Sequence, residues 1–343
     1  MPSTLIQAPN EFSHLPKTEF RTKLDVKPKS GLFPDGYKTT GQQPPLYEEI
    51  HPYSDFPKEI TGITAWVKYD LQGTPEREAL WKHPLTKEEL EDISTAAENF
   101  MSSGRDLNEM CKGLFPLPGM AKYLEQEWGM RKSATAYMGL GAHFGHIVSQ
   151  NGKGHLLGHI KDLGENPADF HKVRLYRTTA RQTFHADPAD IVGLLCLNTP
   201  LEGGQNNIVS GHRVWNIMQK ERPDIAELLT QPIWYFDRKG EVSSGQEEYI
   251  RCAIYYIERN NGRVYSKFDP NYVRFSDKGI IPPLSNAQAE AIEFFDKTCY
   301  EESILNVLEV GDAHFMTNNH LYHSRQAYTD HESPAPRRHL LRL

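Results

Sequence analysis

The sequence predicts a mainly β fold with helices, in which a double-stranded β-helix (jelly roll) forms the core and helices flank it. Short β-like runs between turns fill the chain from about Val173 onward. The tripeptide Asn260-Asn261-Gly262 joins two of these runs, which is a strong hairpin signal. Many short strands with long-range returns suggest a double-sheet jelly roll, although this pattern does not separate it from another β-sandwich.

Seven runs carry the strand pattern, and two helices interrupt the series. The expected strands are Val173–Tyr176, Ile191–Leu197, Ile233–Phe236, Ile250–Ile257, Arg263–Phe268, Ile304–Val310 and His339–Leu343. The first interrupting helix is expected from His212 to Lys220. The second is expected to begin after Ser285, with Gln288 as its capping-box partner, and to run through Phe294.

The part of the chain before the strands reads differently. Residues 1–60 are rich in Pro, Gly, Lys and aromatic residues without a regular apolar period, so we expect residues 1–80 to be an irregular segment that wraps the core. Within it, alternation over Ile63–Tyr69 predicts a strand. Residues 81–343 are then expected to form a single jelly-roll domain.

Two helices are expected ahead of the strand series. Thr86-Lys87-Glu88-Glu89 is a capping box followed by apolar residues at helical spacing. A second helical stretch is expected near Pro118–Trp128. The Gly-rich run Tyr137–Gly145 follows no clear strand pattern, and it lacks the GKS or GKT that would make it a P-loop.

Composition excludes several function classes. The net charge of −7 argues against non-specific nucleic-acid binding, which needs a basic surface. Residues 1–30 lack the apolar core of a signal peptide and no run reaches the length of a membrane span, so we expect a cytoplasmic protein. The oligomeric state does not follow from the sequence, which is compatible with a homo-oligomer.

Four widely spaced cysteines form no CxxC pair, which argues against a structural zinc knuckle. They are expected to be buried free thiols in a reducing compartment. The four are Cys111, Cys196, Cys252 and Cys299.

The motif His185-Ala186-Asp187 is the first candidate for chemistry. Residues two apart on a strand point to the same face, so one imidazole and one carboxylate can hold a single cation. A late histidine would complete the two-histidine, one-carboxylate set of non-haem Fe(II) oxygenases. The segment 311–325 offers His314, His320 and His323 for that place.

The same ligands also suit a catalytic zinc, so a zinc hydrolase or lyase is an alternative, and a non-catalytic β-sandwich binding protein is another. A serine hydrolase lacks its GxSxG motif here.

Several further pieces carry a family resemblance. They are Phe184-His185-Ala186-Asp187, Val192-Gly193-Leu194-Leu195-Cys196-Leu197, Glu202-Gly203-Gly204, Gly311-Asp312, Asn318-Asn319, His323-Ser324-Arg325 and the terminal Arg-Arg-His-Leu-Leu-Arg-Leu. In this order, over roughly residues 110–343, the chain resembles the TauD/TfdA (clavaminate-synthase-like) Fe(II)/2-oxoglutarate dioxygenases, and especially their fungal branch.

The resemblance implies roles for individual residues. It makes His323 the third metal ligand beside His185 and Asp187. It makes Arg338 the clamp for the distal carboxylate of 2-oxoglutarate, and Asn206 stands where the family has a Ser or Thr that bonds this co-substrate. Arg337 is expected to point outward.

Two further arginines are candidates for the substrate. By the resemblance, Arg342 contacts the co-substrate or an anionic group of the substrate. Arg181, four residues before His185, would share its face of a continuous strand and suit a substrate carboxylate.

The expected activity follows from this set. Fe(II), 2-oxoglutarate and O2 would oxidise a small-molecule substrate, with decarboxylation of 2-oxoglutarate to succinate. Asp187 is the carboxylate that related halogenases lack, so its presence favours hydroxylation, desaturation or ring formation. The resemblance suggests an amino acid or another carboxylate of fungal secondary metabolism as substrate.

Overall fold

The computed structural model describes residues 51–104, 129–150, 155–167, 173–238, 242, 247–258, 262–273 and 279–343. Most of the expected N-terminal segment, the helix near Pro118–Trp128, Cys111 and the Asn260-Asn261 pair lie outside these residues. The boundary at residue 80 therefore stays a prediction.

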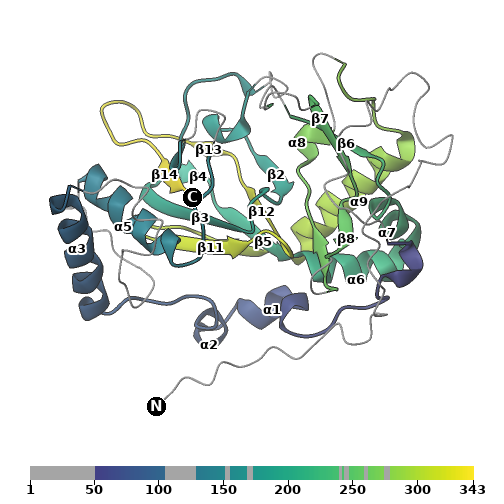
Figure 1. Cartoon of the computed structure of the whole chain (residues 1–343), viewed down its shortest axis with the longest axis horizontal. Helices are drawn as coiled ribbons and strands as arrows, with labels where there is room; N and C mark the ends of the chain where they lie inside the picture. Colours follow the sequence, from purple (N-terminus) through teal and green to yellow (C-terminus); the bar gives the residue numbers. More distant parts are fainter. Residues whose placement is uncertain are drawn as a thin grey trace.

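Two four-stranded antiparallel sheets form the centre of the molecule (Figure 1). The first has the order β1 (Gly158–Ile160), β14 (His339–Arg342), β3 (Ile191–Asn198), β11 (Ala313–Thr317). The second has the order β10 (Ile304–Asn306), β5 (Asn206–Ser210), β12 (Leu321–Arg325), β2 (Gln182–His185). Neighbours in both sheets are far apart in sequence, which is the long-range return expected of a jelly roll.

Three two-stranded ribbons extend this core. They are β4 (Glu202–Gly203) with β13 (Tyr328–Thr329), β6 (Trp234–Asp237) with β7 (Tyr249–Cys252), and β8 (Tyr255–Ile257) with β9 (Val264–Ser266). The β8–β9 pair is the hairpin that the Asn-Gly signal predicts. The expected strand Ile250–Ile257 is divided between β7 and β8.

Helices cover the outer faces of the two sheets (Figure 1). On one side lie α3 (Lys87–Ser102) and α5 (Met130–Ala142); on the other lie α6 (Gly211–Glu221), α7 (Pro223–Leu229) and α9 (Asn286–Glu302). The short helical pieces are η1 (Tyr53–Asp55), η2 (Ile63–Ala65), α1 (Lys68–Leu71), α2 (Pro75–Glu78), η4 (Leu175–Arg177) and α8 (Pro270–Val273).

Both expected capping boxes form. The Glu89 amide donates to Thr86 Oγ1 at 3.2 Å at the start of α3, and the Gln288 amide donates to Ser285 Oγ at 3.2 Å at the start of α9. Each side chain satisfies a backbone donor that the first helical turn leaves without a partner. The two interrupting helices are confirmed as α6 and α9, and α9 continues past Phe294 to Glu302.

Two separate cores hold the helices on the sheets. Leu195 of β3 and Leu341 of β14 pack with Ile93 of α3 and Tyr137 of α5. On the other side, a larger cluster joins β2, β5 and β12 to the second helical layer; its largest members include Trp215, Phe295, Tyr322 and Phe184. Because each sheet has one face on a helical core, the facing sides of the two sheets are left to form a cavity.

Two expectations about local structure are wrong, and a third segment takes a structure that the sequence left open. Ile63–Tyr69 forms η2 and the start of α1, because its backbone finds partners in side chains instead of a strand: Ser210 Oγ donates to Thr64 O and Val67 N donates to Asp70 Oδ2. The Val173–Tyr176 run enters η4. The run Tyr137–Gly145 starts inside helix α5.

The glycines of α5 have a packing reason. A Cβ at Gly141 would lie 2.6 Å from Leu343 Cδ1, so glycine lets the Leu343 side chain pack on this helix without moving.

Residues 57 and 60, before the first strand, contact helix α6. The Asn216 side chain accepts from Ile60 N and donates to Ile60 O, both at 2.7 Å. Trp215 Nε1 donates to Pro57 O at 3.0 Å.

Cys196, Cys252 and Cys299 are buried free thiols, as expected. Within the described ranges, no helix has the length and apolar character that crossing a bilayer requires.

Candidate metal centre and anion-binding cavity

Two neighbouring strands bring the metal-ligand candidates together. His185 is the last residue of β2, and it is the cross-strand partner of His323 on β12, so their ring centroids lie 4.2 Å apart. Asp187 follows in the turn after β2 instead of on the strand itself. One donor atom from each of the three residues lies within 4.8 Å of the others. Donors of this number and kind leave part of the metal's coordination sphere open for other ligands.

The hydrogen bonds of His185 suit a metal ligand. Its Nδ1 lies 2.9 Å from Thr183 O, and because a carbonyl only accepts, Nδ1–H is the donor. The lone pair is then on Nε2, which accepts from Gln182 Nε2 at 3.0 Å. A carbonyl that fixes the tautomer of a ligating imidazole is the usual arrangement in metal sites.

The other two histidines of segment 311–325 lie elsewhere. The His320 ring stacks on His212 with centroids 5.3 Å apart, and His314 Nδ1 lies 3.0 Å from Asn306 Nδ2. Of the three candidates, only His323 joins His185 and Asp187.

Electrostatics keep the donors in their ligating forms. Burial, together with the nearby His185, lowers the pKa of His323 well below 6.5, so this imidazole is neutral at pH 7. Burial acts to raise the pKa of Asp187, but Arg342 and the two histidines outweigh it, and the net shift is downward. A neutral imidazole and an ionised carboxylate are the forms that bind a divalent cation.

A second layer of hydrogen bonds fixes the turn that carries Asp187. Asn318 Oδ1 accepts from the Asp187 amide at 3.1 Å, and its Nδ2 donates to Ala189 O at 2.9 Å. Lys267 Nζ donates to Pro188 O at 3.0 Å and to Ala189 O at 3.2 Å. The turn is therefore held from both sides before any metal binds.

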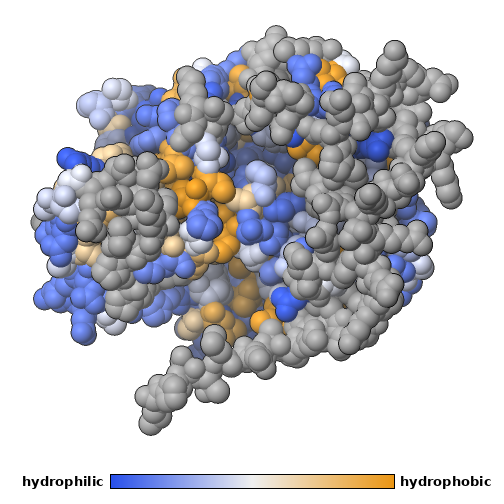
Figure 2. Space-filling model, viewed as in Figure 1, coloured by the Kyte–Doolittle hydropathy of each residue, from blue (hydrophilic) through white to orange (hydrophobic). Residues whose placement is uncertain are grey.

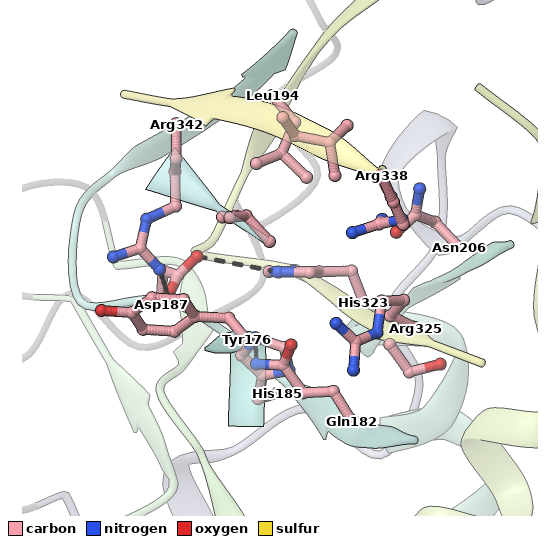
Figure 3. Close-up of a pocket in the computed structure, with 13 residues that line it drawn as sticks. Tyr176, Gln182, His185, Asp187, Leu194, Asn206, His323, Arg325, Arg338 and Arg342 are labelled. Atoms are coloured by element: carbon pink, nitrogen blue, oxygen red, sulfur yellow. Dashed lines mark hydrogen bonds and ion pairs between the residues drawn. The ribbon is translucent and has the colours of Figure 1, made fainter. Parts of the chain in front are cut away.

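A cavity of about 400 Å³, counting its open mouth, adjoins the triad between the two sheets (Figure 3). It is lined by Ile160, Tyr176, Gln182, His185, Asp187, Leu194, Asn206, His323, Ser324, Arg325, Arg338, Leu340 and Arg342. Three guanidinium groups thus face a cavity whose one carboxylate is the metal-ligand candidate Asp187.

One end of the cavity is cationic and buried. Arg338 and Arg325 are each 4% exposed, and their guanidinium carbons lie 5.0 and 4.9 Å from the centroid of the Tyr328 ring. Asn206, also 4% exposed, lines the same end (Figure 3). Burial lowers the pKa of Arg325 to about 10 and lowers that of Arg338, yet both stay charged at pH 7.

Gly204 leaves room for the Arg338 side chain at the buried cationic end of the cavity. Its φ is +73°, and a Cβ there would lie 3.2 Å from Arg338 Nε. Both the backbone conformation and the close approach of the guanidinium therefore favour glycine.

Arg342 marks the opposite end of the cavity, beside Asp187 (Figure 3). Its Nη1 lies 3.8 Å from Asp187 Oδ1, its Nε donates to Gln150 Oε1 at 2.8 Å, and its guanidinium lies 5.1 Å from the Tyr176 ring centroid. Figure 2 shows apolar side chains gathered near the C-terminus that carries this residue.

The structure does not bring Arg181 to this cavity. Residue 181 precedes β2, and its guanidinium pairs with Asp296 of α9 at 3.2 Å while 46% of the side chain is exposed. Arg337 points outward as expected, toward Asp162 and Asp330.

Comparison with known proteins agrees with this geometry. The model of the family described as "Taurine catabolism dioxygenase TauD, TfdA family" matches residues 126–343, more than half of the chain. The chain belongs to this family. The expected resemblance and the expected dioxygenase class are thereby confirmed, and the zinc hydrolase and binding-protein alternatives are not favoured.

Two relatives match most of this TauD/TfdA-family chain. FR-33289 synthase of Streptomyces rubellomurinus is 27% identical over 315 residues, covering 83% of this chain and 90% of that protein. Taurine hydroxylase-like protein SAT17 of Stachybotrys chartarum is 24% identical over 292 residues, covering 76% of this chain and 73% of that protein. One of these relatives is from a Streptomyces and the other is from Stachybotrys, so placement of this chain in the fungal branch stays a prediction.

Solved structures confirm the fold. Asparagine oxygenase, in complex with Fe(II), 2S,3S-3-hydroxyasparagine and succinate, aligns with a TM-score of 0.57 at 13% identity, covering 76% of this chain and 91% of that one. The non-heme iron oxygenase OrfP, in complex with Fe and alpha-ketoglutaric acid, aligns with a TM-score of 0.52 at 13% identity, covering 76% and 92%.

Sequence reasoning gave no role to Arg325 and Gln182, which line this family member's cavity, or to Gln150, which contacts the lining residue Arg342. Arg325 lies two residues after His323 on β12, so the period of two along a strand could have found it. Gln182 and Gln150 gave no such signal, because their contacts with His185 and Arg342 depend on the tertiary structure.

Proposed function

We propose that this enzyme oxidises a carbon of a small molecule that carries an anionic group, with 2-oxoglutarate as co-substrate. The single observation that carries the proposal is the order of groups along one cavity. A buried arginine end lies on one side of His323, and Arg342 lies beside Asp187 on the other (Figure 3).

The residues present fit Fe(II). His185, Asp187 and His323 offer two nitrogen donors and one oxygen donor, which is the set that non-haem Fe(II) oxygenases use. Bound there, Fe(II) supplies the activation of O2 that is coupled to the oxidative decarboxylation of 2-oxoglutarate to succinate.

The chain itself holds and orients the two organic molecules. Arg338 offers a buried fork of N–H donors, which matches a carboxylate in geometry and charge. Asn206 can donate a further hydrogen bond from its amide. The apolar walls of Leu194, Leu340 and Ile160 keep water away from the space between the two ends.

Arg342 supports an anionic group on the substrate. Gln150 holds its Nε, so its Nη groups keep their direction, and it is more exposed than Arg338, as a group at the substrate side must be. Asparagine oxygenase and OrfP, which share this fold, have hydroxylated amino acids in their complexes, and amino acids carry such a group. Hydroxylation, desaturation and ring formation all agree with this arrangement.

The test is oxygen-dependent formation of succinate. The purified protein with Fe(II) and 2-oxoglutarate is expected to release succinate, faster when a true substrate is added from a panel of small carboxylates and other anions. Asp187→Ala is expected to abolish this release, and Arg181→Gln, on an exposed arginine outside the cavity, is the control. Full turnover in Asp187→Ala would refute the assignment of the metal site.

A second measurement tests the substrate end. Arg342→Gln is expected to raise the KM for an anionic substrate by about ten- to a hundredfold, since a charge-assisted hydrogen bond contributes about 1.5–3 kcal/mol. An unchanged KM with every substrate of the panel would refute the anion-binding role of Arg342.

A further inference from the structure

Arg325 lines the cavity but has no role in the function proposed above. It is two residues beyond His323 on β12, so both side chains project from the same face of the strand into the cavity. Its partner across β12 and β5 is Asn206, the residue at the expected co-substrate position. The strand register thus sets this guanidinium beside the residues that form the buried cationic end.

The hydrogen bonds of Arg325 are incomplete. Its Nη2 donates to Thr178 O at 3.0 Å and also to Ala180 O, which ties the side chain to the segment before β2. Among the described residues, its buried Nε and Nη1 have no hydrogen-bond partner, and neither does the buried Nη1 of Arg338. A buried polar group without a partner is costly, and a buried cation more so.

No carboxylate of the described residues lies within ion-pair distance of either guanidinium. The nearby acids are engaged elsewhere: Asp162 and Asp330 pair with Arg337, and Asp330 Oδ1 also accepts from the Arg338 amide. The two buried cations, both about 5 Å from the centroid of the Tyr328 ring, repel each other. One anion between them would relieve this repulsion and satisfy the three open N–H groups.

We propose that Arg325 is a second cation of the co-substrate site, so that the distal carboxylate of 2-oxoglutarate is held between Arg325 and Arg338. This inference rests on the proposed function. It adds a specificity determinant: the site requires a 2-oxo acid with a carboxylate at its far end, because a methyl group there would leave both buried guanidiniums without an anion.

The experiment compares two 2-oxo acids that differ only at the far end. 2-Oxoglutarate has a distal carboxylate, whereas 2-oxopentanoate, of the same length, has a methyl group. The dissociation constant of each is measured by calorimetry without oxygen on the Fe(II)-loaded protein. The variants are Arg325→Gln, Arg338→Gln as the positive control, and Arg181→Gln as the matched control on an exposed arginine.

The expected result is selective for the dicarboxylate. Arg325→Gln is expected to weaken 2-oxoglutarate binding by about ten- to a hundredfold, the loss of a charge-assisted hydrogen bond, and to change 2-oxopentanoate binding by less than twofold. Arg338→Gln behaves in the same way, and Arg181→Gln binds both acids as the wild type does.

Other results separate the possible failures. Equal weakening of both acids in Arg325→Gln, or unchanged binding of 2-oxoglutarate, overturns the role of Arg325 while the proposed function stands. If the wild-type protein binds Fe(II) but not 2-oxoglutarate, the proposed function fails and this inference fails with it. If Arg325→Gln does not fold, Arg325→Lys keeps a point charge without the fork. That variant must then lower the preference for 2-oxoglutarate severalfold, and an unchanged preference overturns the inference.

Discussion

Asn318 is the residue through which the sheet core positions the metal-ligand carboxylate. It is 1% exposed and forms two side-chain hydrogen bonds to one short turn, to the Asp187 amide and to Ala189 O. We therefore expect Asn318→Ala to weaken metal binding although Asn318 does not contact the metal.

The magnitude follows from these two bonds. Leaving a buried partner unsatisfied costs about 1–3 kcal/mol, and the turn is part-exposed, so water can satisfy some of it. We expect the free energy of unfolding to fall by about 1–2 kcal/mol. Loss of an outer partner of a metal ligand typically lowers metal affinity by about ten- to a hundredfold, and we expect that range here.

The assay is anaerobic titration of the apoprotein with Fe(II), and with Co(II) as a spectroscopic substitute. The neighbouring Asn319→Ala is the matched control, because Asn319 Nδ2 reaches only Asp190 Oδ1, at 3.3 Å in an exposed position. Asn319→Ala is expected to bind metal within twofold of the wild type. Wild-type metal affinity in a folded Asn318→Ala variant would refute the reasoning.

Three further changes test other parts of the structure. Gly204→Ala is expected to cost about 1–2 kcal/mol of stability through its positive φ and also to weaken 2-oxoglutarate binding, because the added Cβ would press on Arg338. Gly262→Ala has a similar φ but no neighbour within 4 Å, so it should lose stability only, and equal co-substrate binding in both variants would contradict this. Burial lowers the pKa of His212 to about 4, so between pH 6.5 and 4 the unfolded chain binds the proton more tightly. The free energy of unfolding should therefore fall by about 1.4 kcal/mol per pH unit as the pH is lowered through this window. In His212→Gln, the free energy of unfolding measured in urea should depend less steeply on pH. An unchanged slope would contradict this role of His212. Ser285→Ala removes the cap of α9 and should lower the free energy of unfolding by about 1 kcal/mol, and no change in urea unfolding would show that the cap is not needed.

Local patterns predicted much of this fold. Capping boxes predicted where α3 and α9 begin, because their hydrogen bonds join residues three apart and need no other part of the chain. Alternation and turn residues predicted β3 and the β8–β9 hairpin. The same reasoning failed at Ile63–Tyr69, where backbone groups bond to the side chains of Ser210 and Asp70 instead of to a neighbouring strand.

The candidate site divides in the same way. The motif His185-x-Asp187 and the terminal arginines are visible in the sequence, and the family resemblance assigned their expected roles. Three histidines, His314, His320 and His323, could have been the third ligand. The pairing of β12 with β2 places His323 opposite His185 and so decides among them. Arg181 looked like a neighbour of His185, but the strand begins after it and the side chain turns to α9.

By itself, the sequence determined the chemical groups and the local elements, since residue type and short-range hydrogen bonds are written in neighbouring positions. Only the tertiary structure decided which groups share a cavity. Strand register set Arg325 opposite Asn206, and the turn after β2 was fixed by the distant Asn318. Within the described part of the chain, three guanidinium nitrogens of Arg325 and Arg338 were left buried without a hydrogen-bond partner. The physical reason is that burial and unmet hydrogen bonds are properties of packed surroundings, which come from segments far apart in the chain.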